Sequence, residues 1–129
     1  MKEVLRSVKP YWLYLILTGK KTVEIGKSCP QAKDWNKVVE MYCSKDMRSF
    51  NRIPEEDKEW MRKYLGKVIG EFVCDKIEEF SVGSLRSDDI ENLACLSYSE
   101  MIDYFYKPKE LDGKTAKHGY AWHISDLKI

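Results

Sequence analysis

A lysine and a glutamate three residues apart are the pair in this 129-residue sequence whose types and spacing best support chemistry. Lys21 and Glu24 belong to the segment Gly19-Lys20-Lys21-Thr22-Val23-Glu24. A lysine shielded from water can activate a nucleophile, and a carboxylate beside it can orient the lysine or accept a proton. The hydroxyl of Thr22 would assist such a reaction. The same pair can also bind a ligand through charge and hydrogen bonds, so both binding and catalysis are consistent with it.

The position of Lys21 decides whether it can share a pocket with Glu24. Side chains alternate along a strand, so residues three apart in one regular strand face opposite sides. Lys21 must therefore lie in the turn before regular pairing begins, and Gly19 favours such a turn because glycine readily ends a helix in the left-handed conformation. Exposed lysine-glutamate pairs are also common and contribute little, so a solvated ion pair is the alternative interpretation.

The elements that would position this pair follow from hydrophobic periodicity and from Pro and Gly signals. One helix begins at Pro10 and ends near residue 18, and a second covers residues 54–65. Ser97 and Glu100 form a capping box for a third, which closes at Lys107-Pro108. Residues 45–52 and 107–117 are predicted as basic loops. Five strands are predicted, over residues 3–9, 21–27, 37–44, 67–75 and 119–127.

The varied connections between these strands do not form a regular βαβ series, which disfavours a doubly wound sheet. We predict an α+β fold: one domain over residues 1–129, with a small mixed β-barrel of about five strands, formed by one curved sheet, and flanking helices. Gly70 within its strand predicts a bulge or a close backbone approach. The first helix is apolar nearly all round, so it is either buried or has one face against a protein partner.

Composition excludes several classes of protein. The sequence is 43% hydrophobic and 33% charged, which is typical of a globular protein. Its longest apolar run, residues 11–17, is shorter than the roughly 20 residues needed to cross a membrane. No signal-peptide cleavage pattern accompanies that run. We therefore expect a cytoplasmic protein that makes no membrane contact.

The cysteines and histidines lack metal-ligand spacing. The four cysteines occur singly, which predicts free thiols in a reducing compartment. His118 and His123 are separated by an odd number of residues, so they face opposite sides if they share a strand. We expect neither a metal site nor a cofactor.

Charge is divided unevenly along the chain. Residues 1–52 hold 11 Lys/Arg and 5 Asp/Glu, a net of +6, whereas residues 53–129 hold 11 and 16, a net of −5. A basic face on a nearly neutral protein suits a local anionic ligand better than binding along a duplex, which needs many phosphate contacts. The alternative is that folding mixes the two halves into a neutral surface.

Several motifs, taken in order, resemble the ASCH family, named for activating signal cointegrator homology, over nearly the whole chain. The motifs are Ser7-x-Lys9-Pro10, Gly19-x-Lys21-x-x-Glu24, Tyr42-Cys43-Ser44-Lys45, Gly66-Lys67-Val68-Ile69-Gly70-Glu71-Phe72 and Gly119-Tyr120-Ala121-Trp122-His123-Ile124. The resemblance implies a PUA-like β-barrel and a cleft around a Gly-x-Lys-x-x-Glu-x-Arg motif that binds RNA or modified nucleosides.

Gly26 stands where that motif has its arginine. The departure removes a guanidinium that would hold a phosphate bidentately or neutralise Glu24. Lys27 is next along the chain, but it faces the other side of a regular strand unless the strand is bulged at Gly26.

The predicted ligand site combines the motif residues with two residues near the end of the chain. Trp122 would stack on a base and His123 would hydrogen-bond to it, although neighbours in a strand cannot both face one cleft. Trp122 in the core is the alternative. The complete set of predicted ligand-binding residues is Ser7, Lys9, Gly19, Lys20, Lys21, Glu24, Gly26, Lys27, Ser44, Lys45, Trp122 and His123.

Three functions are compatible with these features. The first is a module that binds RNA or a small nucleoside-like ligand. The second is a small hydrolase in which Lys21, Glu24 and Thr22 are catalytic, and the resemblance implies an amidohydrolase of acylated nucleosides or a ribonuclease. The third is a protein-interaction domain that uses the first helix. The sequence contains no Gly-x-Ser-x-Gly elbow, Gly-rich phosphate loop or His-Glu-x-x-His motif, so those enzyme classes lack support.

Overall fold

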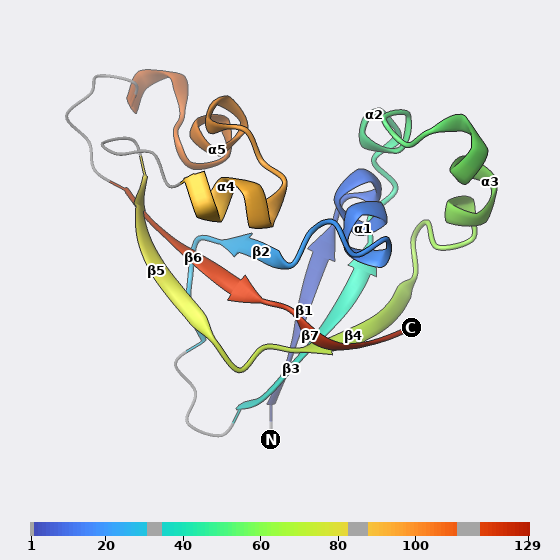
Figure 1. The fold of residues 1–129 in the computed structure, drawn as a ribbon, viewed down its shortest axis with the longest axis horizontal. Helices are drawn as coiled ribbons and strands as arrows, with labels where there is room; N and C mark the ends of the chain where they lie inside the picture. Colours follow the sequence, from blue (N-terminus) through green and yellow to red (C-terminus); the bar gives the residue numbers. More distant parts are fainter. Residues whose placement is uncertain (1, 31–34, 83–87, 111–116) are drawn as a thin grey trace.

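The computed structural model describes residues 2–30, 35–82, 88–110 and 117–129, which fold into two sheets with helices around them (Figure 1). The four-stranded sheet has the order β1 (Lys2–Val8), β3 (Trp35–Cys43), β4 (Val68–Val73), β7 (Ser125–Lys128). The three-stranded sheet has the order β2 (Val23–Gly26), β6 (Lys117–His123), β5 (Ile77–Val82). Only the β1–β3 pair is parallel among these described strands, so the larger sheet is mixed.

The α+β class is confirmed, but the prediction of one curved sheet closing into a barrel is wrong for the described residues. The strand predicted over residues 119–127 is divided at Ile124, so that β6 pairs with β2 and β5 while β7 pairs with β4. One segment therefore passes from one sheet to the other. Gly70 makes the close approach that the sequence predicted, because a Cβ there would collide with the backbone oxygen of Lys128 on β7.

The three predicted helices are present as α1 (Pro10–Leu17), α3 (Glu55–Arg62) and α5 (Tyr98–Phe105). Gly19 has φ of +80° and follows α1, as predicted. Both hydrogen bonds of the Ser97–Glu100 capping box are formed.

Sequence reasoning missed β5 and two short helices, α2 (Met47–Phe50) and α4 (Asp88–Ala94), together with a 3₁₀ turn at Pro108–Glu110. A four-residue helix is too short to show periodicity, and α2 depends on Asp46, whose carboxylate accepts a hydrogen bond from the Ser49 amide. The loop predicted at residues 45–52 is therefore partly wrong. Residues 111–116 of the other predicted loop lie outside the described residues.

Two hydrophobic clusters hold the layers together. The larger one packs Leu13 and Ile16 of α1 against β3 and β4, where Met41 and Phe72 are buried. The smaller one packs Ile25 of β2 against α4 and α5. Helix α1 is thus buried by the chain itself, the first of the two outcomes expected for it. In Figure 1, helices α1, α2 and α3 lie on one side of β2, and helices α4 and α5 lie on the other.

The described residues contain no helix long and apolar enough to cross a membrane. All four cysteines are free thiols. Within the described part of the chain, no three side chains of the metal-binding types form a cluster that could hold an ion.

Candidate functional site

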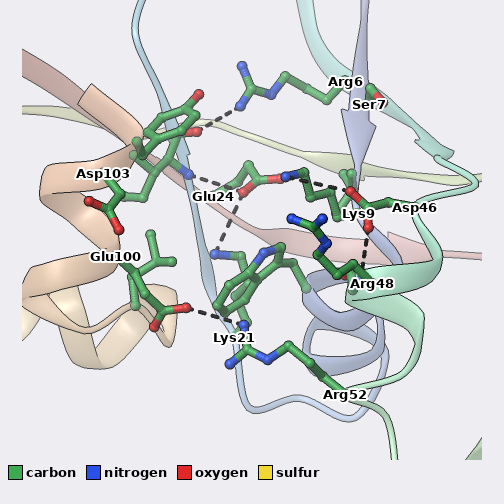
Figure 2. Close-up of a pocket in the computed structure, with 16 residues that line it drawn as sticks. Arg6, Ser7, Lys9, Lys21, Glu24, Asp46, Arg48, Arg52, Glu100 and Asp103 are labelled. Carbon is green, nitrogen blue, oxygen red and sulfur yellow. Dashed lines mark hydrogen bonds and ion pairs between the residues drawn. The ribbon is translucent and has the colours of Figure 1, made fainter. Parts of the chain in front are cut away.

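A cavity of about 570 Å³ lies between β1, α1 and α2 on one side and α5 on the other, with the start of β2 at its floor (Figure 2). We call it the cleft. Its lining includes both ionic and aromatic side chains: Arg6, Ser7, Val8, Lys9, Trp12, Lys21, Glu24, Ile25, Asp46, Arg48, Ser49, Arg52, Leu96, Glu100, Asp103 and Tyr104.

Lys21 occupies the turn before β2, as the spacing argument required. Its backbone amide donates to the oxygen of Leu15, the same oxygen that accepts from Lys20, so the end of α1 fixes this turn. The Lys21 side chain is only 2% exposed, and Nζ donates to the backbone oxygen of Ala94 at 2.7 Å. Lys21 is therefore held at both ends: its backbone is bonded to the end of α1, and its ammonium is bonded to the end of α4.

Glu24 completes a buried ion pair with Lys21. Its Oε1 lies 3.6 Å from Lys21 Nζ and accepts a hydrogen bond from the Ile25 amide at 3.2 Å. Burial lowers the pKa of Lys21 from 10.5, and the charge of Glu24 opposes that shift. The solvated alternative is excluded, because both side chains are nearly covered.

Basic side chains from residues 1–52 and acidic side chains from residues 53–129 face each other across the cleft. Figure 2 shows Arg6, Lys9, Arg48 and Arg52 on the side of β1 and α2, opposite Glu100 and Asp103 of α5. Arg52 reaches across and lies 3.2 Å from Glu100, whereas Lys9 pairs with Asp46 on its own side at 3.7 Å. At this site folding keeps the two halves on opposing walls instead of mixing them.

Two aromatic rings also line the cleft, and neither was predicted to do so. Trp12 comes from α1, and the Lys21 ammonium lies 5.6 Å from its ring centroid. Tyr104 comes from α5, and the ammonium of Lys27 lies 4.7 Å from its ring centroid. The sequence could not single out Trp12, because the helix that carries it is apolar on nearly every side.

Four of the predicted ligand-binding side chains line the cleft, namely Ser7, Lys9, Lys21 and Glu24. Lys27 does not line the cleft, but its ammonium lies over the ring of Tyr104, which does. The turn residues Gly19, Lys20 and Thr22 are exposed and do not line it, and Gly26 is buried behind Arg6.

The remaining predicted residues lie elsewhere. Trp122 is 2% exposed, and its indole donates to the backbone oxygen of Ser28 at 3.3 Å, so it belongs to the core. His123 Nε2 is 2.6 Å from a carboxylate oxygen of Glu78 on β5. Lys45 packs its stem against Gly66, and Ser44 does not line the cleft.

Arg6 is a further cleft residue that sequence reasoning missed. Its Nη2 donates to the backbone oxygen of Ile25 at 2.7 Å, and its guanidinium carbon lies 5.1 Å from the ring centroid of Trp122. Glu24 and Arg6 therefore hold the two polar groups of the same residue, the amide and the carbonyl of Ile25. The only signal in the sequence was a basic residue one position before Ser7.

Comparison with known proteins supports the fold. No family model matches the chain, and no curated protein matches it. The crystal structure of an ASCH protein from Zymomonas mobilis does match, with a TM-score of 0.63 and 21% identity, over 98% of this chain and 69% of that one. Two single-substitution variants of that protein match with TM-scores of 0.62, at 21% and 23% identity, over 99% and 98% of this chain and 72% and 70% of theirs.

The fold and cleft define an α+β protein with a buried lysine-glutamate pair beneath an open pocket. The structural matches identify the fold as ASCH-like, as the order of motifs predicted.

Proposed function

We propose that this protein is an ASCH-family module that binds a nucleoside-type ligand, either free or presented by an unpaired position of RNA. The buried Lys21–Glu24 pair at the floor of the cleft carries the proposal. It sets one cationic donor and one carboxylate acceptor side by side, a combination that matches the mixed donors and acceptors on the edge of a base.

The shape and lining of the cleft support a ligand of this size. A volume of about 570 Å³ falls within the roughly 300–1,000 Å³ of small-molecule sites. Such sites combine apolar walls with a few placed polar groups. Trp12 and Tyr104 offer the aromatic faces on which bases stack.

The charges of the cleft favour one nucleoside unit over a long strand. Glu100 and Asp103 form an acidic wall that would repel a polyanion lying along the cleft. A single unstacked base or a free nucleoside can contact the basic wall without placing a row of phosphates beside the acidic wall. RNA binding would accordingly require an unpaired nucleotide and few phosphate contacts.

Calorimetric titration tests this proposal, with the four common nucleosides, N4-acetylcytidine and a short single-stranded RNA as ligands. The Lys21→Met/Glu24→Gln double variant removes both charges and should abolish binding. Lys45→Met is the matched control, because Lys45 keeps an apolar stem against Gly66 and lies outside the cleft. Equal binding by all three proteins would exclude the cleft floor as the site, and failure of the wild type to bind any of these ligands would overturn the function.

Hydrolysis of an acylated nucleoside is the second candidate, and the lowered pKa of Lys21 favours it. A lysine whose pKa is lowered by burial reaches its neutral form at a lower pH than an exposed one. In that reaction water would add to the acyl carbonyl and give a proton to Glu24, and the ammonium of Lys21 would give a proton to the departing amine as the C–N bond breaks. Glu24 would then return its proton to Lys21, 3.6 Å away. Thr22 is exposed outside the cleft, so its hydroxyl has no role in this scheme.

Binding of a protein partner by α1 is the third hypothesis. The helix already buries Pro10 and residues 13–16 within the chain's own core. Only Tyr11, Trp12 and Leu17 among its apolar side chains are partly exposed, so the structure offers this hypothesis no support.

A further inference from the structure

The space beside Gly26 in β2 is filled by Arg6 from β1. A Cβ on Gly26 would lie 3.2 Å from Nη1 of Arg6 and 3.0 Å from Nε1 of Trp122. Both separations are below the about 3.5–4.0 Å of ordinary non-bonded contact between carbon atoms. A side chain at position 26 would therefore force Arg6 or Trp122 to move by a few tenths of an ångström, and an arginine there would compete with Arg6 for the same space. Arg6 thus brings a guanidinium from β1 to the position beside Gly26, where the motif that this sequence resembles has its arginine.

The position of the Arg6 guanidinium is well defined. Its Nη2 bonds to the Ile25 oxygen, and one face lies against Trp122, which is itself held by Ser28. A planar group fixed by a hydrogen bond and an aromatic face loses little further freedom when it binds a ligand.

Arg6 also retains unused donor capacity. Lys9, Lys21 and Arg52 each pair with a carboxylate in the cleft, whereas no described carboxylate forms an ion pair with Arg6. Its Nε is buried without a hydrogen-bond partner in the described structure. The carbonyl of Ile25 takes up one of the five N–H groups, so the guanidinium can accommodate an anion.

We propose that Arg6 recognises an anionic group of the ligand, a phosphate ester carried by the nucleoside, and that Gly26 is the residue that gives Arg6 access to the cleft. This inference rests on the proposed function and adds the ligand class. Ser7 of β1 and Lys9, which precedes α1, also line the cleft, so this wall offers a hydroxyl and an ammonium as well. The opposite wall is acidic, which directs the phosphate toward β1.

The test compares each nucleoside with its 5′-monophosphate and with a dinucleotide by calorimetric titration. The wild type should prefer the monophosphate, and Arg6→Gln should reduce that preference by about 10-fold to 100-fold, the value of one hydrogen bond to a charged group. Its affinity for the neutral nucleoside should change by less than about threefold. Arg62→Gln is the matched control, because Arg62 stacks on Phe50 and does not line the cleft. Preference for the monophosphate over the dinucleotide would identify a free nucleotide as the source.

A reciprocal exchange tests the relation between the two positions without any ligand. Gly26→Arg alone should lower the melting temperature, because two guanidinium groups then compete for one space. Adding Arg6→Ala should restore the melting temperature and the preference for the monophosphate. Simple addition of the two single-variant effects would contradict the exchange.

The outcomes separate this inference from the proposed function. Equal wild-type affinity for nucleosides and their monophosphates would leave the function standing and overturn the role of Arg6. Equal weakening of both ligands in Arg6→Gln would assign Arg6 a purely structural role, which also overturns it. Failure of the wild type to bind nucleosides and nucleotides alike would reject the function and the inference together.

Discussion

The Oε1 atom of Glu24 lies 3.6 Å from the Lys21 ammonium and also accepts the Ile25 amide hydrogen. One carboxylate oxygen therefore serves both the ion pair and the backbone of β2. Removing either charge should affect stability and ligand binding in different ways, which makes the two roles separable.

Substitutions at this pair should reveal a conflict between stability and binding. Lys21→Met leaves Glu24 buried without its counter-charge and should destabilise the fold by about 3–5 kcal/mol. The Lys21→Met/Glu24→Gln double variant should recover most of that loss, because no unpaired charge is then left buried. Urea denaturation measures both values. A double variant as unstable as Lys21→Met alone would show that the pair stabilises the fold.

Glu24→Gln distinguishes a binding module from a hydrolase. Glutamine preserves the acceptor for the Ile25 amide but is a poor base. If Glu24 accepts a proton in hydrolysis, turnover of N4-acetylcytidine should fall by about 10²–10⁴-fold while affinity changes little. If the protein only binds, affinity and ligand preference should change and no turnover should be seen in wild type. Chromatographic product analysis measures turnover, and a wild type without turnover would remove the enzyme hypothesis.

Trp12 should contribute more to ligand binding than Trp60 or Trp122. It lines the cleft, whereas Trp122 is buried and Trp60 donates its indole hydrogen to Asp57 on α3. Trp12→Leu should cost about 1–3 kcal/mol of binding free energy, the value of one stacked base. Trp60→Leu is the control and should leave the affinity unchanged. Equal losses in the two variants would argue against stacking on Trp12.

The ion pair between Arg52 and Glu100 should compete with an anionic ligand. Glu100→Gln removes the charge but keeps an oxygen that can accept from the Ser97 amide in the capping box. Both side chains are substantially exposed, so the gain in affinity for a nucleoside monophosphate should be modest, about twofold to fivefold. Affinity for the neutral nucleoside serves as the internal control. Weaker monophosphate binding in the variant would contradict the competition.

The thiols should divide into two reactive and two protected groups. Cys29 and Cys95 are partly exposed, whereas burial raises the pKa of Cys43 and of Cys74 to about 11. A disulfide reagent at pH 8 should modify two thiols quickly in the native protein and four in urea. Four fast thiols in the native state would contradict the burial of Cys43 and Cys74.

The same pKa values predict loss of stability at alkaline pH. In the unfolded chain these thiols ionise near 9.0, while in the folded protein they stay protonated to about 11. Their contribution is complete below pH 9.0 and is lost as the pH rises toward 11. Lys21 acts in the opposite direction, because its pKa is lowered on folding and stability rises as the pH passes upward through that folded value. The Lys21→Met/Glu24→Gln variant should therefore lose stability more steeply in this range when urea unfolding is followed against pH.

Local signals in the sequence were sufficient to place the Lys21 turn. Gly19 predicted the end of α1, and strand alternation required Lys21 to precede β2, which is where it lies. The Ser97–Glu100 box likewise follows from a local rule that tertiary packing did not alter. These features depend on a few adjacent residues, so the sequence carries them directly.

The cleft walls depend on contacts that no local pattern contains. Arg6 meets Gly26 from a different sheet, and Arg52 meets Glu100 across 48 positions in the sequence. Trp122 was expected at the ligand but is buried, because its side chain packs into the larger hydrophobic cluster. Which aromatic residue faces the cleft is therefore decided by the arrangement of the layers.

The most direct measurement is a titration of isotopically labelled protein with the tightest-binding nucleoside or nucleotide, followed by nuclear magnetic resonance. The account predicts that the largest shift changes fall at the Glu24 and Ile25 amides and at the Trp12 indole. The indole of Trp122, the ring of His123 and the Lys45 amide should shift much less. Changes centred on Trp122, His123 or Lys45 would contradict the cleft as the binding site.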